Sequence, residues 1–138
     1  MTAASTREVV LAYLEAINAG DVERAADLVA DDFFNEHTSA LGSSLRGQAA
    51  YRERLPRFLA QFTGLRYEVE DVIEDGDRCA VPYTMTFDWR GDDGSIHPVR
   101  IRGMFRFRVA DGRIAHRVDY WDGTEFQRQT TPTPSGAP

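Results

Sequence analysis

The spacing of the apolar residues changes once along this 138-residue chain, at Leu65. Before Leu65, apolar side chains recur every three or four positions, as on one face of a helix, and after it they alternate with polar ones, as on a half-buried strand. The turn sequences EDGD, GDDG and ADGR divide the second part into strands near 65–74, 78–90, 96–109 and 113–122. Helices followed by hairpin-linked strands predict an α+β fold, in which a curved antiparallel sheet wraps the N-terminal helices and leaves a cone-shaped cavity.

The part before Leu65 predicts three helices. Ser5 and Glu8 have the spacing of a capping box, and the helix that follows is expected to end at Gly20. Asp21 is placed to cap a second, short helix. The apolar positions of the third helix are Tyr51, Leu55, Phe58, Leu59 and Phe62.

Two residues interrupt the pattern of the third helix. Pro56 must either kink the helix or mark a fresh start, because proline cannot donate a backbone hydrogen bond. Gly64 is expected to end it. Between the second and third helices, Phe33 and Phe34 are expected to begin a short strand.

The composition is that of one small acidic domain, expected over residues 1–128, with a disordered tail over 129–138. Sixteen basic residues, all arginine, against 22 acidic ones give a formal net charge of -6, which disfavours nucleic acid or an anionic membrane as a partner. The N-terminal residues form no long apolar run, so neither a signal peptide nor a membrane span is expected. The single cysteine, Cys79, permits no intrachain disulfide and fits a reducing, cytoplasmic location.

The one basic stripe lies on a predicted strand. Its members, Arg100, Arg102, Arg106 and Arg108, alternate with Val99, Ile101, Phe105 and Phe107. Such alternation is typical of a strand with one polar face, so the stripe indicates a solvated or subunit-facing sheet surface rather than a nucleic-acid site.

The two ends of the predicted domain carry a family resemblance. The opening AYLEAINAGDVERAADLVADDF is similar to the start of ketosteroid isomerases, and the closing GRIAHRVDYWDGTEF resembles the last strand of limonene epoxide hydrolases. SnoaL-like polyketide cyclases also end with a WD followed by a glutamine, as Trp121, Asp122 and Gln129 do here. The chain therefore resembles the nuclear transport factor two-like superfamily, to which these three branches belong.

The resemblance implies a catalytic carboxylate at Asp119, the first residue of the DYWD sequence. Strand alternation puts Asp119 on the same face as Arg117 and Trp121. A carboxyl group inside an apolar cavity has a raised pKa, which suits proton transfer near neutral pH. The alternative is a structural ion pair between Asp119 and Arg117 or another arginine. Asp122, at the strand end, is expected to be a turn or rim residue.

His37 occupies the position where SnoaL-like cyclases commonly carry a histidine. With an ordinary pKa near ~6.5, an imidazole could accept or donate a proton, or polarise a carbonyl. A loop histidine without a catalytic role is the alternative. The remaining histidines, His97 and His116, give no short metal-ligand spacing with it, so no metal site is expected.

Tyr13 falls on the cavity-facing tyrosine of the isomerases, which binds an oxyanion. Core packing alone would also explain it, although a buried phenol still needs a hydrogen-bond partner. The second acid of the isomerase site corresponds to Gly103 here, so ketosteroid isomerase activity itself is not expected.

Asp88, in the sequence YTMTFDW, is similar to a second catalytic aspartate of the epoxide hydrolases, with Thr86 in place of their arginine. The opposite strand register would instead turn Tyr83, Met85 and Phe87 toward the cavity. The sequence leaves both registers open, because a shift of one residue exchanges the two faces of a strand.

Aromatic residues are numerous enough to line a site for a lipophilic ligand. The candidate substrate-binding residues are Phe33, Phe58, Tyr83, Phe87, Phe105 and Trp121.

These features favour a cofactor-independent enzyme that uses Asp119 and His37 as acid and base on a lipophilic, enolisable carbonyl compound, with Tyr13 as hydrogen-bond donor and cyclisation or isomerisation as the outcome. Epoxide hydrolysis involving Asp88 is the first alternative, and a non-catalytic module that binds a lipophilic molecule is the second. The resemblance also implies a homodimer through the outer face of the sheet.

Overall fold

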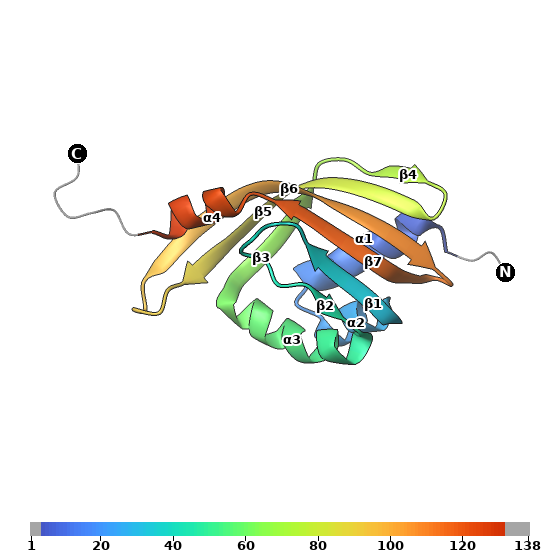
Figure 1. Ribbon diagram of the computed structural model, residues 1–138, viewed down its shortest axis with the longest axis horizontal. Coiled ribbons are helices and arrows are strands. Elements are labelled where there is room, and N and C mark those ends of the chain that lie inside the picture. Colours follow the sequence, from blue (N-terminus) through green and yellow to red (C-terminus); the bar gives the residue numbers. More distant parts are fainter. Residues whose placement is uncertain (1–3, 132–138) are drawn as a thin grey trace.

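The computed structural model describes residues 4–131, which form one curved sheet with helices on its concave side (Figure 1). The helices are α1 (Thr6–Asn18), α2 (Val22–Asp27), α3 (Gln48–Gln61) and α4 (Gly123–Thr130). The strands are β1 (Val29–His37), β2 (Leu45–Arg46), β3 (Phe62–Val69), β4 (Ile73–Asp75), β5 (Arg78–Arg90), β6 (Ile96–Ala110) and β7 (Arg113–Trp121). The predicted α+β class is confirmed.

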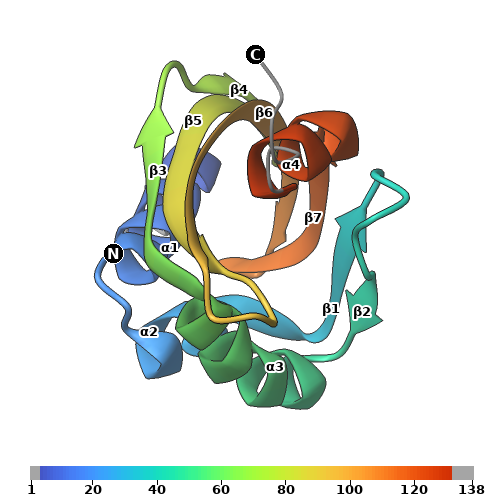
Figure 2. The ribbon, with the colours of Figure 1, turned by 90° about the vertical axis from the view of Figure 1, so that its left-hand side faces the viewer.

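The strands are ordered β2-β1-β7-β6-β5-β3, with β4 pairing to β5 beside this series. The strands β3, β5, β6 and β7 pair antiparallel, as predicted, whereas β1 runs parallel to β7. Viewed from its end, the sheet curls from β3 round to β2, and α3 lies between these two edges (Figure 2). Helix α3 therefore lies across the open side of the curved sheet.

The helix caps follow the predicted pattern. Ser5 and Glu8 form the expected capping box at the start of α1, and Asp21 accepts a hydrogen bond from the backbone of Arg24 at the start of α2. Pro56 lies inside α3, which continues past it. The helix ends at Gln61, so Gly64 lies in β3 rather than at the helix end as predicted.

Three strand and tail boundaries also differ from prediction. The short strand expected at Phe33 extends over all of β1, and the strand expected over 65–74 divides into β3 and β4. The sequence did not predict α4. This helix continues to Thr130, past the boundary placed at residue 128. Residues 132–138 of the predicted tail lie outside the described residues.

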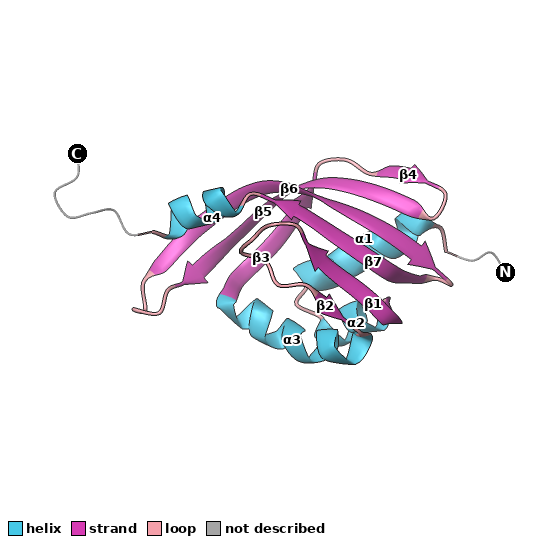
Figure 3. Ribbon diagram, in the orientation of Figure 1, coloured by secondary structure: helices cyan, strands magenta, loops and turns pink. Residues whose placement is uncertain are grey.

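Helix α1 lies against the sheet (Figure 3), and buried side chains of α1 and of the strands form most of the core. Its largest fully buried side chains include Tyr13, Tyr83, Phe33, Phe105 and Phe107. Cys79 is buried in β5, as expected of a strand residue. The arginine stripe of β6 points outward, and its alternating apolar partners are buried, which confirms the predicted faces. The homodimer through this outer face stays a prediction.

No helix within residues 4–131 is both long enough and apolar enough to cross a membrane.

Candidate functional site

A cavity of about 730 Å³ lies between the concave face of the sheet and α3. Aromatic and aliphatic side chains form most of its wall, with Leu55 and Phe58 from α3 facing Met85 and Phe87 from β5. Phe126 of α4 adds to the wall and packs against Trp89 and Trp121. The size and the apolar wall suit a lipophilic small molecule. Its polar lining residues include Asn35, His37, Tyr51, Arg54, Tyr67, Arg117 and Asp119.

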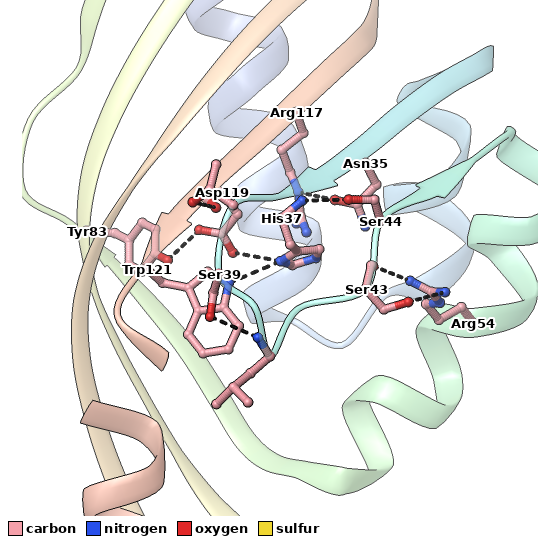
Figure 4. A network of polar contacts seen from close by, with 12 residues as sticks. Asn35, His37, Ser39, Ser43, Ser44, Arg54, Tyr83, Arg117, Asp119 and Trp121 are labelled. Carbon is pink, nitrogen blue, oxygen red and sulfur yellow. Dashed lines mark hydrogen bonds and ion pairs between the residues drawn. The ribbon is translucent and has the colours of Figure 1, made fainter. Parts of the chain in front are cut away.

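Asp119 enters this cavity from β7, on the same face as Arg117 and Trp121, as the alternation predicted. Its side chain is nearly inaccessible, and its Oδ1 accepts a hydrogen bond of 2.6 Å from the hydroxyl of Tyr83 (Figure 4). Burial raises the pKa of Asp119, while the charge of Arg117 and the Tyr83 hydrogen bond act in the opposite direction. The net effect is a pKa of Asp119 above the usual value for an aspartate.

His37 lies beside Asp119 because β1 and β7 pair in parallel, with these two residues in register. Nδ1 of His37 is 3.7 Å from Oδ2 of Asp119 and accepts a hydrogen bond of 3.2 Å from the indole N–H of Trp121. Burial, and then the charges of Arg117 and Arg54, lower the pKa of His37 to about 3. The imidazole is therefore neutral at neutral pH, with its proton on Nε2, and its contact with Asp119 is not an ion pair.

Arg117 lies on the floor of the cavity. Its Nε donates to Oδ1 of Asn35 at 2.9 Å, and its Nη1 donates to the hydroxyl of Tyr13 at 3.0 Å. Its guanidinium carbon lies 5.1 Å from the centre of the Phe105 ring. Among residues 4–131, no carboxylate lies within ion-pair distance of Arg117, so the structural pair with Asp119 considered above is not formed.

Two tyrosines in the wall are neutral phenols. Tyr51 lies against Tyr13, and their hydroxyls share a short hydrogen bond. Tyr67, from β3, packs against Tyr83 and Phe105. Burial raises the pKa of both Tyr51 and Tyr67 well above the usual value for a phenol, so each can donate a hydrogen bond at neutral pH.

Four polar atoms of the lining make no hydrogen bond within the described part of the chain: Asp119 Oδ2, His37 Nε2, the Tyr67 hydroxyl and Arg117 Nη2. Every side-chain nitrogen or oxygen that is fully buried in the described part of the chain has a hydrogen-bond partner. The four atoms without a partner are therefore not fully buried, and their residues line the cavity. They amount to one proton acceptor, two neutral donors and one cation, a combination that can bind and ionise a carbonyl compound.

The cavity does not include Tyr13 or Asp88. Tyr13 lies fully buried beneath the floor, where it contacts Arg117 and Tyr51, so the structure places it outside the cavity lining, and its predicted role as a donor to a ligand has no support from this geometry. Asp88 lies exposed on the outer face of β5, because the register turns Tyr83, Met85 and Phe87 inward. The structure therefore places Asp88 outside this cavity as well, and its catalytic role stays a prediction without support from this geometry.

The aromatic candidates divide into two groups. Phe58, Phe87 and Trp121 line the cavity, as predicted. The other three are fully buried in the core behind the wall and do not line it: Phe33, Tyr83 and Phe105. The sequence could show that they face inward, but it could not show how many layers of side chains separate them from the cavity.

Two polar residues that follow β7, Asp122 and Gln129, have structural roles. Asp122 caps α4, as expected of a turn residue. Gln129 bonds to the backbone of Arg100 on β6 and holds α4 against the sheet. Within residues 4–131, no three His, Cys, Asp or Glu side chains come together in a group that could hold a metal ion.

Three site residues were not predicted: Asn35, Tyr67 and Arg117 as a cavity residue. Tyr67 could have been found from the alternation of β3, which turns Leu65 and Tyr67 inward. Arg117 is in phase with Asp119, but the sequence gives no sign that it lacks a carboxylate partner. Asn35 depends on the parallel pairing of β1 with β7, which has no local signal.

The family model described as SnoaL-like domain matches residues 10–117. No curated protein matches the sequence.

Several solved structures are similar over most of their length. A protein from Shewanella denitrificans OS-217, described as a SnoaL-like polyketide cyclase, has a TM-score of 0.81 and 16% identity, with 90% of this chain and 95% of that chain covered. An epoxide hydrolase of the limonene epoxide hydrolase type from M. tuberculosis has a TM-score of 0.75 and 22% identity, with 90% and 87% covered. A protein with a ketosteroid isomerase-like fold from Catenulispora acidiphila DSM 44928 has a TM-score of 0.79 and 17% identity, with 95% and 98% covered. At these identities the likeness establishes the fold and not the reaction.

Proposed function

The chain belongs to the SnoaL-like domain family of the nuclear transport factor two-like superfamily, and on that premise we propose that it is a cofactor-independent enzyme that transfers a proton on a lipophilic carbonyl compound. The observation that carries this proposal is the buried carboxyl of Asp119, which keeps one oxygen free toward an apolar cavity. A carboxylate in such surroundings is a stronger base than one in water, because burial disfavours its charge.

In the proposed reaction, Oδ2 of Asp119 takes a proton from the carbon next to a carbonyl group. The electrons of the broken C–H bond move onto the carbonyl oxygen and form an enolate. In this scheme the Tyr67 hydroxyl and the Nε2–H of His37 donate hydrogen bonds to this oxygen, since both residues line the same cavity as Asp119. Asp119 then returns the proton to another carbon, which gives an isomer. Alternatively, the enolate carbon attacks a second carbonyl carbon and closes a ring; the electrons of that C=O π bond move onto its oxygen, and Asp119 returns the proton to the resulting alkoxide.

His37 contributes as a donor in this scheme and not as the general base. With its pKa lowered to about 3, the imidazole is too weak a base to compete with Asp119 for the proton. A neutral imidazole that donates a hydrogen bond can still polarise a carbonyl group. The pair predicted as acid and base is thus reassigned, with Asp119 alone transferring the proton.

Epoxide hydrolysis has less support in this cavity. That reaction needs one carboxylate to activate water and a second acid to protonate the epoxide oxygen. Asp88, the candidate for the second acid, lies on the outer face. The lining of the described cavity contains Asp119 and one other acidic residue, Glu53, whose carboxylate lies 3.7 Å from Arg57.

A proton-exchange experiment tests the proposal without knowledge of the natural substrate. β-Tetralone, a flat enolisable ketone, is incubated with the protein in deuterated water, and loss of its α-proton signals is followed by NMR. We expect the wild type to accelerate the exchange and Asp119→Asn to lose roughly 100-fold or more of that acceleration, as for removal of a general base. Asp88→Asn is the matched control, since it makes the same change on the outer face.

Equal exchange by Asp119→Asn and the wild type would contradict the role given to Asp119. Absence of exchange by the wild type for a panel of lipophilic ketones would contradict the reaction class. In that case, hydrolysis of styrene oxide would indicate epoxide opening, and inactivity toward both classes would indicate a binding module.

A further inference from the structure

Arg117 is a buried cation in an acidic protein. Its side chain is among the few buried charged ones, with an exposed fraction of 6%. Removing a guanidinium from water is costly unless an opposite charge or a full set of acceptors replaces its hydration. Arg117 is therefore expected to have a partner that explains its position.

The partners within residues 4–131 satisfy its hydrogen bonds only in part, and they carry no negative charge. Nε bonds to the amide oxygen of Asn35 and Nη1 to the phenol oxygen of Tyr13, while Nη2 faces the cavity without a partner there. The ring of Phe105 adds a weak attraction for the cation. Asn35 and Tyr13 thus orient the guanidinium and leave one edge of it turned to the cavity.

The cavity as a whole is lined by more basic than acidic side chains. Three arginines line it, namely Arg54, Arg57 and Arg117, against two acidic residues, Glu53 and Asp119, in a chain whose net charge is negative. Glu53 lies beside Arg57, and Arg54 bonds to the backbone oxygen and the hydroxyl of Ser43 rather than to a carboxylate. A cavity lined by excess positive charge and low-dielectric walls attracts anions.

We propose that the ligand of this cavity is a lipophilic acid, whose carboxylate or acidic enol binds at Nη2 of Arg117 while its ring system packs against the aromatic wall. This inference rests on the proposed function for the location of the site but not for its chemistry. It narrows the substrate class from any enolisable carbonyl compound to one that enters as an anion. Neutral ketones and epoxides of the same size would bind less tightly.

The arrangement also separates two tasks. Arg117 would hold a charge that the substrate carries before reaction, whereas Tyr67 and His37 would stabilise the charge that develops during it. Arg is suited to the first task because its planar guanidinium can give two parallel hydrogen bonds to a carboxylate. Binding of the anion and proton transfer can therefore be tested independently.

The experiment compares acids with their uncharged amides. Naphthoate and naphthamide, together with the benzoate and biphenylcarboxylate pairs, are titrated into the full chain by isothermal calorimetry. The variants are Arg117→Met and Arg117→Gln, both of which remove the charge, and Asp119→Asn, which removes the proposed base. Arg90→Met is the matched control, because Arg90 is exposed at the end of β5 and its loss changes the net charge equally.

We expect the wild type and Arg90→Met to bind at least one acid about tenfold or more tightly than its amide, as for a hydrogen bond to a charged group. Arg117→Met and Arg117→Gln should lose this preference, and Asp119→Asn should keep it. Circular dichroism identifies a variant that fails to fold, and the acid-to-amide ratio of the wild type tests the proposal in any case.

Three results would overturn the inference: equal or tighter binding of the amides by the wild type, a preference for acids that persists in folded Arg117 variants, or no binding of any acid. Failure of the proposed function looks different. There, Asp119→Asn would match the wild type in proton exchange, whatever the acids and amides show.

Discussion

The hydroxyl of Tyr83 donates a 2.6 Å hydrogen bond to Oδ1 of Asp119, although the two residues come from strands that are not neighbours. Tyr83 belongs to β5 and Asp119 to β7, and β6 lies between them. Gly103 of β6 is in register with Tyr83 on one side and with Trp121 on the other. The phenol crosses β6 at this glycine, where a Cβ atom would lie 2.5 Å from the Tyr83 hydroxyl.

Gly103→Ala should therefore destabilise the fold and disturb Asp119. The added methyl group would also lie 2.7 Å from the backbone oxygen of Tyr120, so the strand cannot easily absorb it. We expect a loss of about 1–3 kcal/mol in the free energy of unfolding, as for other overpacked sites. Urea denaturation measures it.

A double-mutant cycle shows whether this cost comes from the tyrosine. Gly103→Ala is measured again in the background Tyr83→Phe, which removes the hydroxyl that the methyl group would meet. The cost should be smaller there, because one of the close contacts is gone. Additive effects would show that Gly103 is not needed for the crossing of Tyr83.

Removal of the Tyr83 hydroxyl should also change the titration of Asp119. The Tyr83 hydrogen bond lowers the pKa of Asp119 and so opposes the effect of burial. In Tyr83→Phe the pKa of Asp119 should rise above its wild-type value. Carbon-13 NMR of labelled aspartate carboxyls follows this change directly, and the acidic limb of any pH–rate profile should move to higher pH with it.

Tyr120→Phe is the control for that measurement. The Tyr120 side chain is exposed, and its hydroxyl accepts hydrogen bonds from Arg106 rather than contacting Asp119. The Asp119 resonance should titrate as in the wild type. An unchanged titration in Tyr83→Phe would mean that the hydrogen bond contributes nothing to the ionisation of Asp119.

The fold could be predicted from the sequence further than the site could. Local signals placed the caps at Ser5 and Asp21 and turned Asp119 inward on β7. His37 lies beside Asp119 because two strands 82 residues apart in sequence pair in parallel, and no local pattern reports such a pairing. The register of β5 was equally open, since both of its faces carry residues of plausible function. Packing of the inward face decided it and excluded Asp88.

The helix α4 shows a second limit. Its sequence GTEFQRQT contains one large apolar residue, Phe126, and no periodic apolar face. Asp122 caps it, but the sequence predicts only a turn at this residue, because nothing after it indicates a helix. Contacts of Phe126 with Trp89 and Trp121 hold the helix in place, and these depend on the tertiary structure.

Asp119→Asn should make the protein more stable at neutral pH. Because burial raises the pKa of Asp119 in the folded state, its favourable contribution is complete below the unfolded pKa and is lost as the pH rises through the folded pKa. Asparagine has a similar shape, keeps an oxygen that can accept from Tyr83, and carries no charge at any pH. The gain in stability relative to the wild type should therefore grow as the pH rises.

Thermal melting curves over a range of pH values measure that gain. An asparagine variant that is less stable than the wild type at every pH would show that the ionised carboxylate is stabilised by its surroundings. Such a result would weaken the case for Asp119 as a base, because a stabilised carboxylate binds a proton less readily.

His37→Asn should reduce the loss of stability in mild acid. The pKa of His37 is lowered from 6.5 to about 3, so its contribution to stability is complete above pH 6.5 and is lost as the pH falls toward 3. At pH 5, one such histidine costs the folded protein about 2 kcal/mol. Asparagine keeps an acceptor for the indole of Trp121 and does not titrate in this range.

The free energy of unfolding of both proteins is measured by urea denaturation at roughly pH 7.5 and roughly pH 5. The wild type should lose about 2 kcal/mol more than the variant between the two conditions. Equal losses would mean that folding does not lower the pKa of His37, and the imidazole would then be a charged donor in mild acid and not a neutral one.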